Sequence, residues 1–397
     1  SDLESMARDA YATFRHDAVA PHVQMGPNDW ILELFHGPTL AFKDVAMQVL
    51  ARLMDHVLRR EGRRATIVGA TSGDTGGAAI EAFRGLSSVD VVILFPDGRV
   101  SDVQRRQMTT VADANIHALA IGGTFDDCQK IVKQLFADRA LAGEVGLSGV
   151  NSINWARIAA QIVYYFTAAS ALGAPARAVS FTVPTGNFGD VFAGYAASRM
   201  GLPVERLVIA TNENDILVRT LETGRYELAG VSATTSPSMD IQISSNFERL
   251  VFEACGRDAA AVRAAMGGLS QSGGFSLAAA PLAAIRDDFS ARRAGEAEVA
   301  GAIAATLSAD GYLLDPHTAV GRVVAAAERR AGTPMVTLAT AHPAKFPDAV
   351  EAACGERPAL PAWLGDLMER RERFEVLPAD AAAVTRFVRD VHGKAAR

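Results

Sequence analysis

The residue best suited to covalent chemistry is Lys43, which lies beside apolar side chains near the predicted start of a helix. Ala41 and Phe42 precede it, a Gly-Pro turn lies just upstream, and an apolar-periodic run over residues 45–58 predicts the helix. The helix dipole and the apolar neighbours both disfavour an ammonium, so we expect a lowered pKa and an amine that can form a Schiff base. Taken alone, these residues are explained better by an ordinary lysine at the start of an amphipathic helix than by a Schiff-base lysine. The methylene groups of such a lysine pack on the helix and its ammonium group reaches water.

Two glycine-rich loops each follow a predicted strand and precede a predicted helix. The first covers residues 72–77 and the second covers residues 185–190. The first amides of a helix lack intrahelical partners, so each loop predicts an anion-binding turn. Neither loop matches a Walker A lysine loop or a full dinucleotide fingerprint. A plain tight turn, with Asp74 or Thr75 as the helix cap, explains the first loop as well.

Two further polar features could bind a ligand. Asn151, Ser152 and Asn154 are cap-type residues at the start of a predicted helix, and Arg157 lies one turn further along. This cluster could hold a phosphate, although a helix cap with a surface arginine explains it better when it is taken alone. Thr340 ends a predicted strand, at the edge where α/β sheets usually bind ligands.

The composition limits the possible partners and compartment. The chain has 397 residues, 49% apolar and 21% charged, and a net charge of −6 that argues against nucleic acid or an anionic membrane as the main partner. No stretch predicts a transmembrane helix, and the first residues lack the order of a secretory signal. The three cysteines are isolated and show no metal spacing, so we expect free thiols, no metal and a cytoplasmic protein.

Strands that alternate with helices predict an α/β fold with parallel sheets. The predicted strands cover residues 66–71, 91–95, 115–121, 178–184, 207–211 and 335–341. The predicted helices cover residues 45–58, 78–83, 125–141, 151–171, 247–255, 296–309 and 380–392, with another beginning at residue 191. Residues 267–284 predict a loop with a short helix, and residues 366–375 predict a solvent-exposed helix.

These parts together suit pyridoxal 5′-phosphate (PLP), which needs a lysine for its aldehyde, an amide-rich loop for its phosphate and a partner for its ring nitrogen. The sequence resembles the threonine synthase family, of the bacterial and fungal type, among the fold-type II PLP enzymes. The resemblance runs from about Trp30 to near the carboxyl end. The stretches that carry it are residues 36–44, 70–76, 151–154, 186–190, 236–242, 315–321 and 339–346.

The resemblance implies two open α/β domains with mostly parallel sheets, similar to the tryptophan synthase β chain. Residues 1–44 would belong to the large domain with the lysine loop, residues 45–166 would form the small domain, and residues 167–397 would form the large PLP-binding domain. Family members usually carry an additional amino-terminal segment before the region that matches residues 2–30. We expect a monomer or a homodimer.

The resemblance also implies a role for each candidate residue. Lys43 would bind PLP covalently and move protons. The other cofactor-binding residues would be Asp74 near the ring 3-hydroxyl, where relatives often carry asparagine, Thr340 at the ring nitrogen, and Gly186, Asn187, Phe188 and Gly189 around the phosphate. The substrate α-carboxylate would contact Ser72, Gly73 and Thr75, and the substrate phosphate would contact Asn151, Ser152, Asn154 and Arg157.

The reaction implied is the conversion of O-phospho-L-homoserine and water to L-threonine and phosphate. Another fold-type II enzyme, such as a threonine dehydratase or a phospholyase-like homologue, is the nearest alternative because it would share the lysine and the phosphate loop. The cluster at residues 151–157 discriminates, since a dehydratase has no substrate phosphate to bind. A non-catalytic ligand-binding homologue and a nucleotide-binding α/β protein are more distant alternatives.

Overall fold

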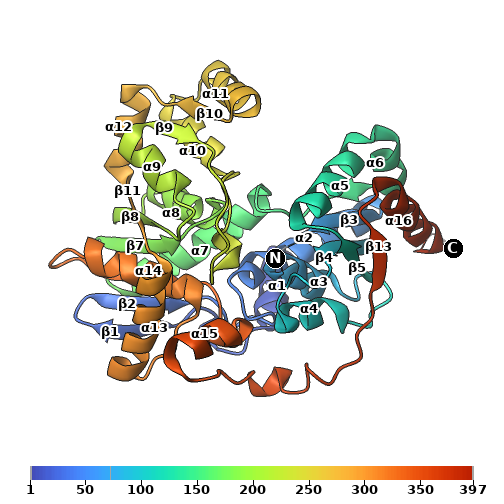
Figure 1. The fold of residues 1–397 in the computed structure, drawn as a ribbon, viewed down its shortest axis with the longest axis horizontal. Coiled ribbons are helices and arrows are strands. Elements are labelled where there is room, and N and C mark those ends of the chain that lie inside the picture. Colours follow the sequence, from blue (N-terminus) through green and yellow to red (C-terminus); the bar gives the residue numbers. More distant parts are fainter. Residues whose placement is uncertain (1, 72, 396–397) are drawn as a thin grey trace. The chain divides into compact units, whose positions relative to one another are not determined.

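The computed structural model describes residues 2–71 and 73–395, and the chain forms two compact units (Figure 1). Unit 1 takes its described residues from Ser1–Val19, His36–Asn154 and Leu360–Arg397, and unit 2 consists of Ala20–Phe35 and Trp155–Ala359. These units differ from the predicted domain ranges at both ends of the chain: residues 36–44 and the described residues before residue 20 lie in unit 1 and not with the large domain, and so does the segment from residue 360. The last segment belongs with unit 1 because its strand pairs with the sheet of that unit.

Unit 1 is built on a parallel sheet in the order β13-β5-β4-β3-β6. Its central strand, β4 (Val89–Pro96), is buried along its whole length, as expected for an apolar run covered on both faces. The other strands are β3 (Ala65–Ala70), β5 (Ile116–Gly122), β6 (Leu147–Ser148) and β13 (Glu375–Pro378). The helices are α1 (Asp2–Tyr11), α2 (Lys43–Glu61), α3 (Asp74–Phe83), α4 (Asp102–Thr109), α5 (Phe125–Ala137), α6 (Arg139–Val145), the 3-10 turn η3 (Ala362–Leu364) and α16 (Ala381–Ala395).

Two predicted helices of unit 1 were wrong in detail. The single helix expected over residues 125–141 is two helices, because Asp138 leaves the helical conformation and its carboxylate caps α6 by accepting from the amides of Ala140 and Leu141. Residues 366–375 form turns and the first residue of β13, not a helix. Here Glu372 pairs with Arg105 of α4, so the charges make tertiary contacts and do not line a solvated helix face.

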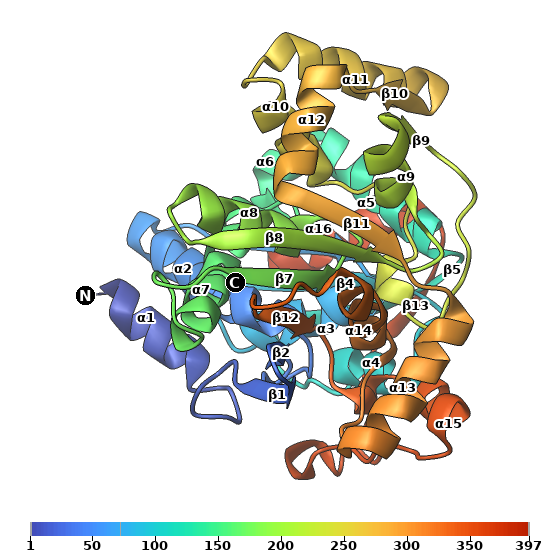
Figure 2. The same ribbon diagram turned by 90° about the vertical axis from the view of Figure 1, so that its left-hand side faces the viewer.

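Unit 2 is built on a larger sheet in the order β1-β2-β12-β7-β8-β11, in which only the β1–β2 pair is antiparallel (Figure 2). Helices α13 and α14 pack together, and α14 also packs on β12, β7 and β8. Elsewhere in the unit α7 packs against α8, and α8 packs on β7 and β8. The strands of this sheet are β1 (His22–Gly26), β2 (Asp29–Glu33), β7 (Val179–Pro184), β8 (Val204–Thr211), β11 (Phe289–Arg293) and β12 (Met335–Ala339). Its helices are α7 (Trp155–Ala171), α8 (Gly189–Arg199), α9 (Ile216–Thr223), α10 (Phe247–Ala254), α11 (Ala259–Ser272), α12 (Ala279–Asp288), α13 (Glu296–Asp310), α14 (Pro316–Glu328) and α15 (Pro347–Cys354), with 3-10 turns η1 (Pro237–Met239) and η2 (Pro343–Lys345).

The glycine-rich region at residues 267–284 is more regular than predicted. Helix α11 continues through Gly267 and Gly268 to Ser272, and β10 (Gly274–Ser276) then pairs with β9 (Arg225–Glu227) before α12 begins. A Cβ on Gly268 would lie 2.9 Å from the carbonyl oxygen of Gly274, so this glycine makes room for the returning strand. Within the described part of the chain, no helix combines the length and the apolar character needed to cross a membrane.

Candidate functional site

Lys43 is the first residue of α2, as the sequence predicted, and its side chain is largely buried. Its Nζ atom lies 3.1 Å from the Oδ2 atom of Asp74 and 5.4 Å from the ring centre of Phe42. The neighbouring carboxylate of Asp44 accepts from the backbone amide of Thr39 at 2.8 Å and from its hydroxyl at 2.7 Å. The loop that presents the lysine is therefore held by a buried carboxylate that the sequence analysis did not single out.

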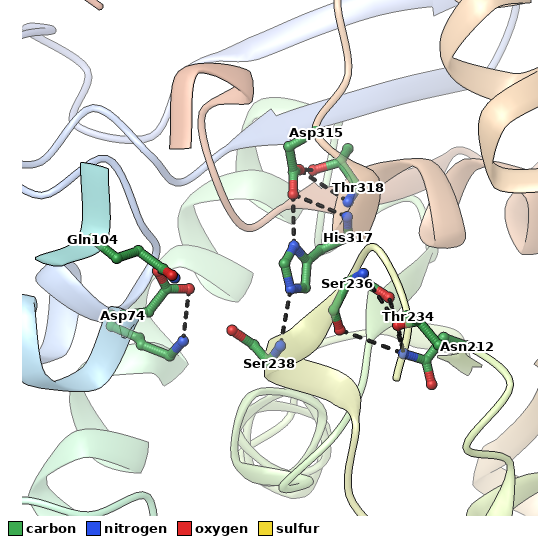
Figure 3. Close-up of polar contacts among 10 residues, drawn as sticks. Asp74, Gln104, Asn212, Thr234, Ser236, Ser238, Asp315, His317 and Thr318 are labelled. Atoms are coloured by element: carbon green, nitrogen blue, oxygen red, sulfur yellow. Dashed lines mark hydrogen bonds and ion pairs between the residues drawn. The ribbon is translucent and has the colours of Figure 1, made fainter. Parts of the chain in front are cut away.

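Asp74 is the first residue of α3, and both oxygens of its buried carboxylate are engaged (Figure 3). The Oδ1 atom accepts from the Nε2 atom of Gln104 at 2.9 Å, while Oδ2 faces Lys43. Gly73 precedes it with φ 139°, and a Cβ there would lie 2.4 Å from the amide of Gln104. A lysine amine and a fixed carboxylate at this distance can exchange a proton.

The rest of the first loop is tied to its own strand. The Oγ1 atom of Thr71 accepts from the backbone amides of Gly73 at 2.9 Å and Gly76 at 3.0 Å. Thr75 is partly exposed, and Ser72, another predicted contact of the substrate carboxylate, lies outside the described residues. The loop is thus a rigid turn that holds Asp74 beside Lys43.

The second loop connects β7 to α8 and has the features of a phosphate-binding turn. Phe188, at the cap position of α8, has φ 65°, and its side chain makes no capping bond, so the first amides of the helix face the loop. The carbonyl of Gly186 accepts from the Ser244 hydroxyl at 2.6 Å, and that of Asn187 accepts from the Asn246 side chain at 3.0 Å. Two of its carbonyls are hydrogen-bonded by residues 244 and 246, and its amides lie at the start of a helix. The loop could therefore bind the phosphate of PLP.

Thr340 directly follows β12, which pairs in parallel with β7. The register Met335 to Ser180 places the carboxyl ends of both strands at the same edge of the sheet. Thr340, which is buried, and the loop of residues 185–189 therefore leave the sheet side by side. A threonine hydroxyl at this edge can hydrogen-bond a pyridine nitrogen.

The predicted substrate-phosphate cluster falls in two parts. Asn151, Ser152 and Asn154 form a turn at the end of the middle segment of unit 1, in which the Asn154 amide donates to the Asn151 carbonyl at 3.2 Å. Arg157 lies in the first turn of α7 in unit 2 and is 4% exposed. Burial lowers the pKa of its guanidinium to about 10, which still leaves a buried cation at neutral pH. The alternative explanation of Arg157 as a surface arginine at a helix cap is therefore wrong, and its predicted contact with the substrate phosphate stays a prediction.

An acid beside the second loop was not predicted as a site residue. Asp190, the second residue of α8, is buried, and its Oδ1 atom accepts from the hydroxyls of Tyr164 at 2.5 Å and Tyr165 at 2.9 Å. Burial raises the pKa of this carboxyl to about 6, and burial also raises the pKa of Tyr165. Adjacent tyrosines in an otherwise apolar helix were the available sequence signal for a buried polar partner.

The chain is similar to known proteins over most of its length. The chain matches the family model for "Pyridoxal-phosphate dependent enzyme" over residues 20–266 and that for "Threonine synthase, C-terminal" over residues 318–388. It is 53% identical over 390 residues to threonine synthase of Pseudomonas aeruginosa, covering 98% of this chain and 83% of that protein.

Two solved structures are similar over nearly the whole chain. PLP-bound threonine synthase from Brucella melitensis is 66% identical with a TM-score of 0.96, covering 98% of this chain and 84% of that one. Threonine synthase from yeast is 41% identical with a TM-score of 0.92 and the same coverage of both chains. These identities far exceed what a shared fold alone requires.

Proposed function

The chain belongs to the threonine synthase family of PLP-dependent enzymes, and we propose that it converts O-phospho-L-homoserine and water to L-threonine and phosphate. The observation that carries the proposal is the buried pair of Lys43 and Asp74, each at the first residue of a helix. In the net reaction the bond from the γ-carbon to the phosphate oxygen breaks, the β-carbon loses one proton and the γ-carbon gains one to become a methyl group. The hydroxyl group of water is added at the β-carbon, and the other proton of water goes to the released phosphate.

Lys43 acts as the covalent anchor of the cofactor and as the group that moves protons at the substrate carbons. Its amine becomes nucleophilic only when it gives up a proton, and the Asp74 carboxylate at 3.1 Å is placed to accept that proton. Gln104 holds the carboxylate from its other oxygen, so the acceptor keeps its orientation while the lysine moves.

Asp74 is also a proposed cofactor contact, near the ring 3-hydroxyl, and the other proposed contacts lie at one edge of the unit 2 sheet. The amides around Gly186, Asn187, Phe188 and Gly189 bind the cofactor phosphate, and the Thr340 hydroxyl contacts the ring nitrogen. When bound, PLP supplies an electron sink that stabilises negative charge developing next to the substrate amine. A neutral hydroxyl at the ring nitrogen favours the unprotonated ring, which limits the strength of that sink.

The substrate is held by its two anionic groups. Gly73, Thr75 and Ser72 bind the α-carboxylate. The phosphate is bound by the amides and side chains of Asn151, Ser152 and Asn154 and by the guanidinium of Arg157. A buried guanidinium supports this role because a desolvated cation is stabilised by a bidentate anion. We also propose that the enzyme is a cytoplasmic monomer or homodimer.

The test is release of phosphate and formation of L-threonine from O-phospho-L-homoserine by PLP-loaded protein. Lys43→Arg is the sharper control because it keeps a cation beside Asp74, and with Lys43→Ala it should lose activity by about 10³-fold or more. Both variants should also lose the visible absorbance of the lysine-bound cofactor. Loaded wild-type protein that forms no threonine would overturn the proposal.

The dehydratase alternative has a separate test. A dehydratase would consume L-threonine and release ammonia, and it would not require the residue 151–157 cluster. We expect ammonia release from L-threonine to be far slower than phosphate release from O-phospho-L-homoserine. Arg157→Lys should raise KM for the phosphorylated substrate, because a lysine cannot make the bidentate contact.

A further inference from the structure

Residues 236–242, to which the composition assigns no role, pack directly against the second loop. They include the 3-10 turn η1. A Cβ on Gly186 would lie 3.0 Å from the carbonyl oxygen of Ser238 and 3.2 Å from the Cα atom of Met239, so the two backbones touch. Any shift of this segment must therefore change the shape of the loop.

His317 reaches the segment from the first turn of α14 (Figure 3). Its Nε2 atom accepts from the backbone amide of Ser238 at 3.3 Å, and its Nδ1 atom lies 2.8 Å from the Oδ2 atom of Asp315. Because Nε2 accepts a hydrogen bond, the proton of the neutral ring is on Nδ1 and is donated to Asp315. The ring is 3% exposed and packs against Phe346 at 4.8 Å between centres, which fixes its orientation.

Asp315 is itself held rigidly at the start of α14. It caps the helix by accepting from the amides of His317 at 2.9 Å and Thr318 at 3.0 Å, and the hydroxyl of Thr318 also donates to it. Asp315 and Thr318 are both almost fully buried. A continuous series of hydrogen bonds thus leads from the helix through Asp315 and His317 to Ser238.

The ends of the segment have a different anchor. Asn212, directly after β8, donates from its side-chain amide to Thr234 at 2.8 Å and to the Ser236 hydroxyl at 2.9 Å (Figure 3). The same amide donates to Asp240 at 2.8 Å. These bonds fasten the segment on both sides of η1, and the bond from His317 fastens Ser238 within it. His317 therefore controls the residue whose carbonyl lies against Gly186.

We propose that His317 is a positioning residue for the cofactor phosphate. Its Nε2 atom holds the Ser238 amide, and Ser238 in turn sets the wall of the loop at residues 186–189. This inference rests on the proposed function, in which that loop binds the phosphate of PLP. It assigns His317 no contact with the cofactor and no part in the covalent bond at Lys43, so losing the bond to Ser238 weakens recognition of the phosphate group alone.

Two variants separate the two hydrogen bonds of the ring. In His317→Gln the longer side chain can place its carbonyl oxygen near the position of Nε2 and so keep an acceptor for Ser238. In His317→Asn the shorter side chain can place its amide near Nδ1, which keeps the donor to Asp315 and loses the acceptor. Each variant loses one buried hydrogen bond, so a purely structural role predicts similar consequences for both.

The experiment measures equilibrium binding of PLP, and of pyridoxal without its phosphate, to cofactor-free protein. We expect His317→Asn to weaken PLP binding by about tenfold and pyridoxal binding by less than about twofold, and His317→Gln to restore most of the PLP affinity. A cooperative thermal unfolding transition of each cofactor-free variant, with its midpoint compared with that of the wild type, checks that both variants are folded.

Gly186→Ala distinguishes the two possible failures. It pushes a methyl group against Ser238 and should weaken PLP, and not pyridoxal, if the loop binds the phosphate. If Gly186→Ala has this effect while the two His317 variants match each other or the wild type, the role of His317 is refuted and the phosphate loop stands. If Gly186→Ala leaves the preference for PLP over pyridoxal unchanged, the assignment of the loop fails, and the role of His317 fails with it.

Discussion

The β3–α3 and β7–α8 connections share a strand, a glycine-rich loop and a helix, yet they use their first helical amides differently. In β3–α3, Thr71 accepts from the amides of Gly73 and Gly76, so the loop satisfies its own donors. In β7–α8 the side chain at the cap position makes no such bond, and the loop is held through its carbonyls by residues 244 and 246. The same sequence pattern is therefore held through two amides by its own threonine in one unit, and through two carbonyls by residues distant in the sequence in the other.

The two connections also differ in the acid that begins each helix. Asp74 faces the Lys43 amine and is part of an ion pair, whereas Asp190 accepts hydrogen bonds from two neutral tyrosine hydroxyls. Pairing with a cation favours the charged carboxylate, while burial among neutral groups disfavours it. The first acid is suited to proton transfer, and the second is suited to joining α7 to α8.

The largest effect should come from Asp190→Asn, measured as the change of stability with pH. The folded carboxyl keeps its proton up to pH about 6, whereas the unfolded one loses it near its ordinary pKa of 3.8. Between these values the folded state binds more protons, so the contribution of this group to stability falls as pH rises from about 4 to 6 and is constant above. The free energy of unfolding of the variant should not show this fall. At pH 7 the variant should therefore be more stable than the wild type by about 3 kcal/mol.

Urea unfolding at several pH values measures the difference between the two proteins, in which all other titrating groups cancel. Asparagine keeps an oxygen that accepts from both tyrosines, so the comparison isolates the charge. Parallel curves for the two proteins from pH 4 to 7 would contradict a buried Asp190 carboxyl with a raised pKa.

A somewhat smaller effect is expected for Asp74→Ala on catalysis. Without the carboxylate, Lys43 loses its proton acceptor, and kcat should fall about a hundredfold. Asp74→Asn keeps a hydrogen-bonding group without the charge and should lie between the alanine variant and the wild type. Gln104→Ala is the control, because it removes a contact of Asp74 and leaves the ion pair with Lys43 in place. A wild-type kcat in Asp74→Ala would refute the proposed role of Asp74 as proton acceptor.

The smallest effect is expected for Thr71→Val, which should lower the free energy of unfolding by about 1–2 kcal/mol, because two buried amides lose their acceptor. The preference for PLP over pyridoxal should stay unchanged, since this loop supports and does not bind the phosphate. Thr66→Val in the same strand is the matched control, because its buried hydroxyl has no hydrogen-bond partner among the described residues. An equal loss in both variants would show that the Thr71 bonds contribute nothing.

Local patterns were enough to predict much of the fold and part of the site. Apolar runs predicted β3, β4 and β5 in the sheet of unit 1 and β7, β8 and β12 in the sheet of unit 2, but not the strands at the sheet edges or β2. The glycine loops were recognised because backbone conformation depends on neighbours in the chain. Lys43 lies at the first residue of α2, where the turn and the apolar period had placed it. These predictions needed only residues within one or two turns of each other.

The residues that were missed depend on partners distant in the sequence. Tyr164 and Asp190 are 26 residues apart, and Ser238 and His317 are 79 residues apart, so no local pattern predicts either bond. The charged residues 366–375 were predicted to form a helix because their contacts with α4 could not be foreseen from the sequence. Arg105 and Glu372, which form one of these contacts, are 267 residues apart. Spacing can identify residues capable of binding, but the fold alone decides which of them meet.

The pairing of β13 with β5 has a consequence for how the molecule is made. Strand β5 is synthesised long before β13, its partner at the edge of the unit 1 sheet. The sheet of unit 1 therefore lacks its edge strand while almost all of unit 2 is synthesised. A chain truncated before residue 375 should therefore have a unit 1 that is more sensitive to protease than that of the full chain. Residues 360–395 complete a structure that begins near the start of synthesis.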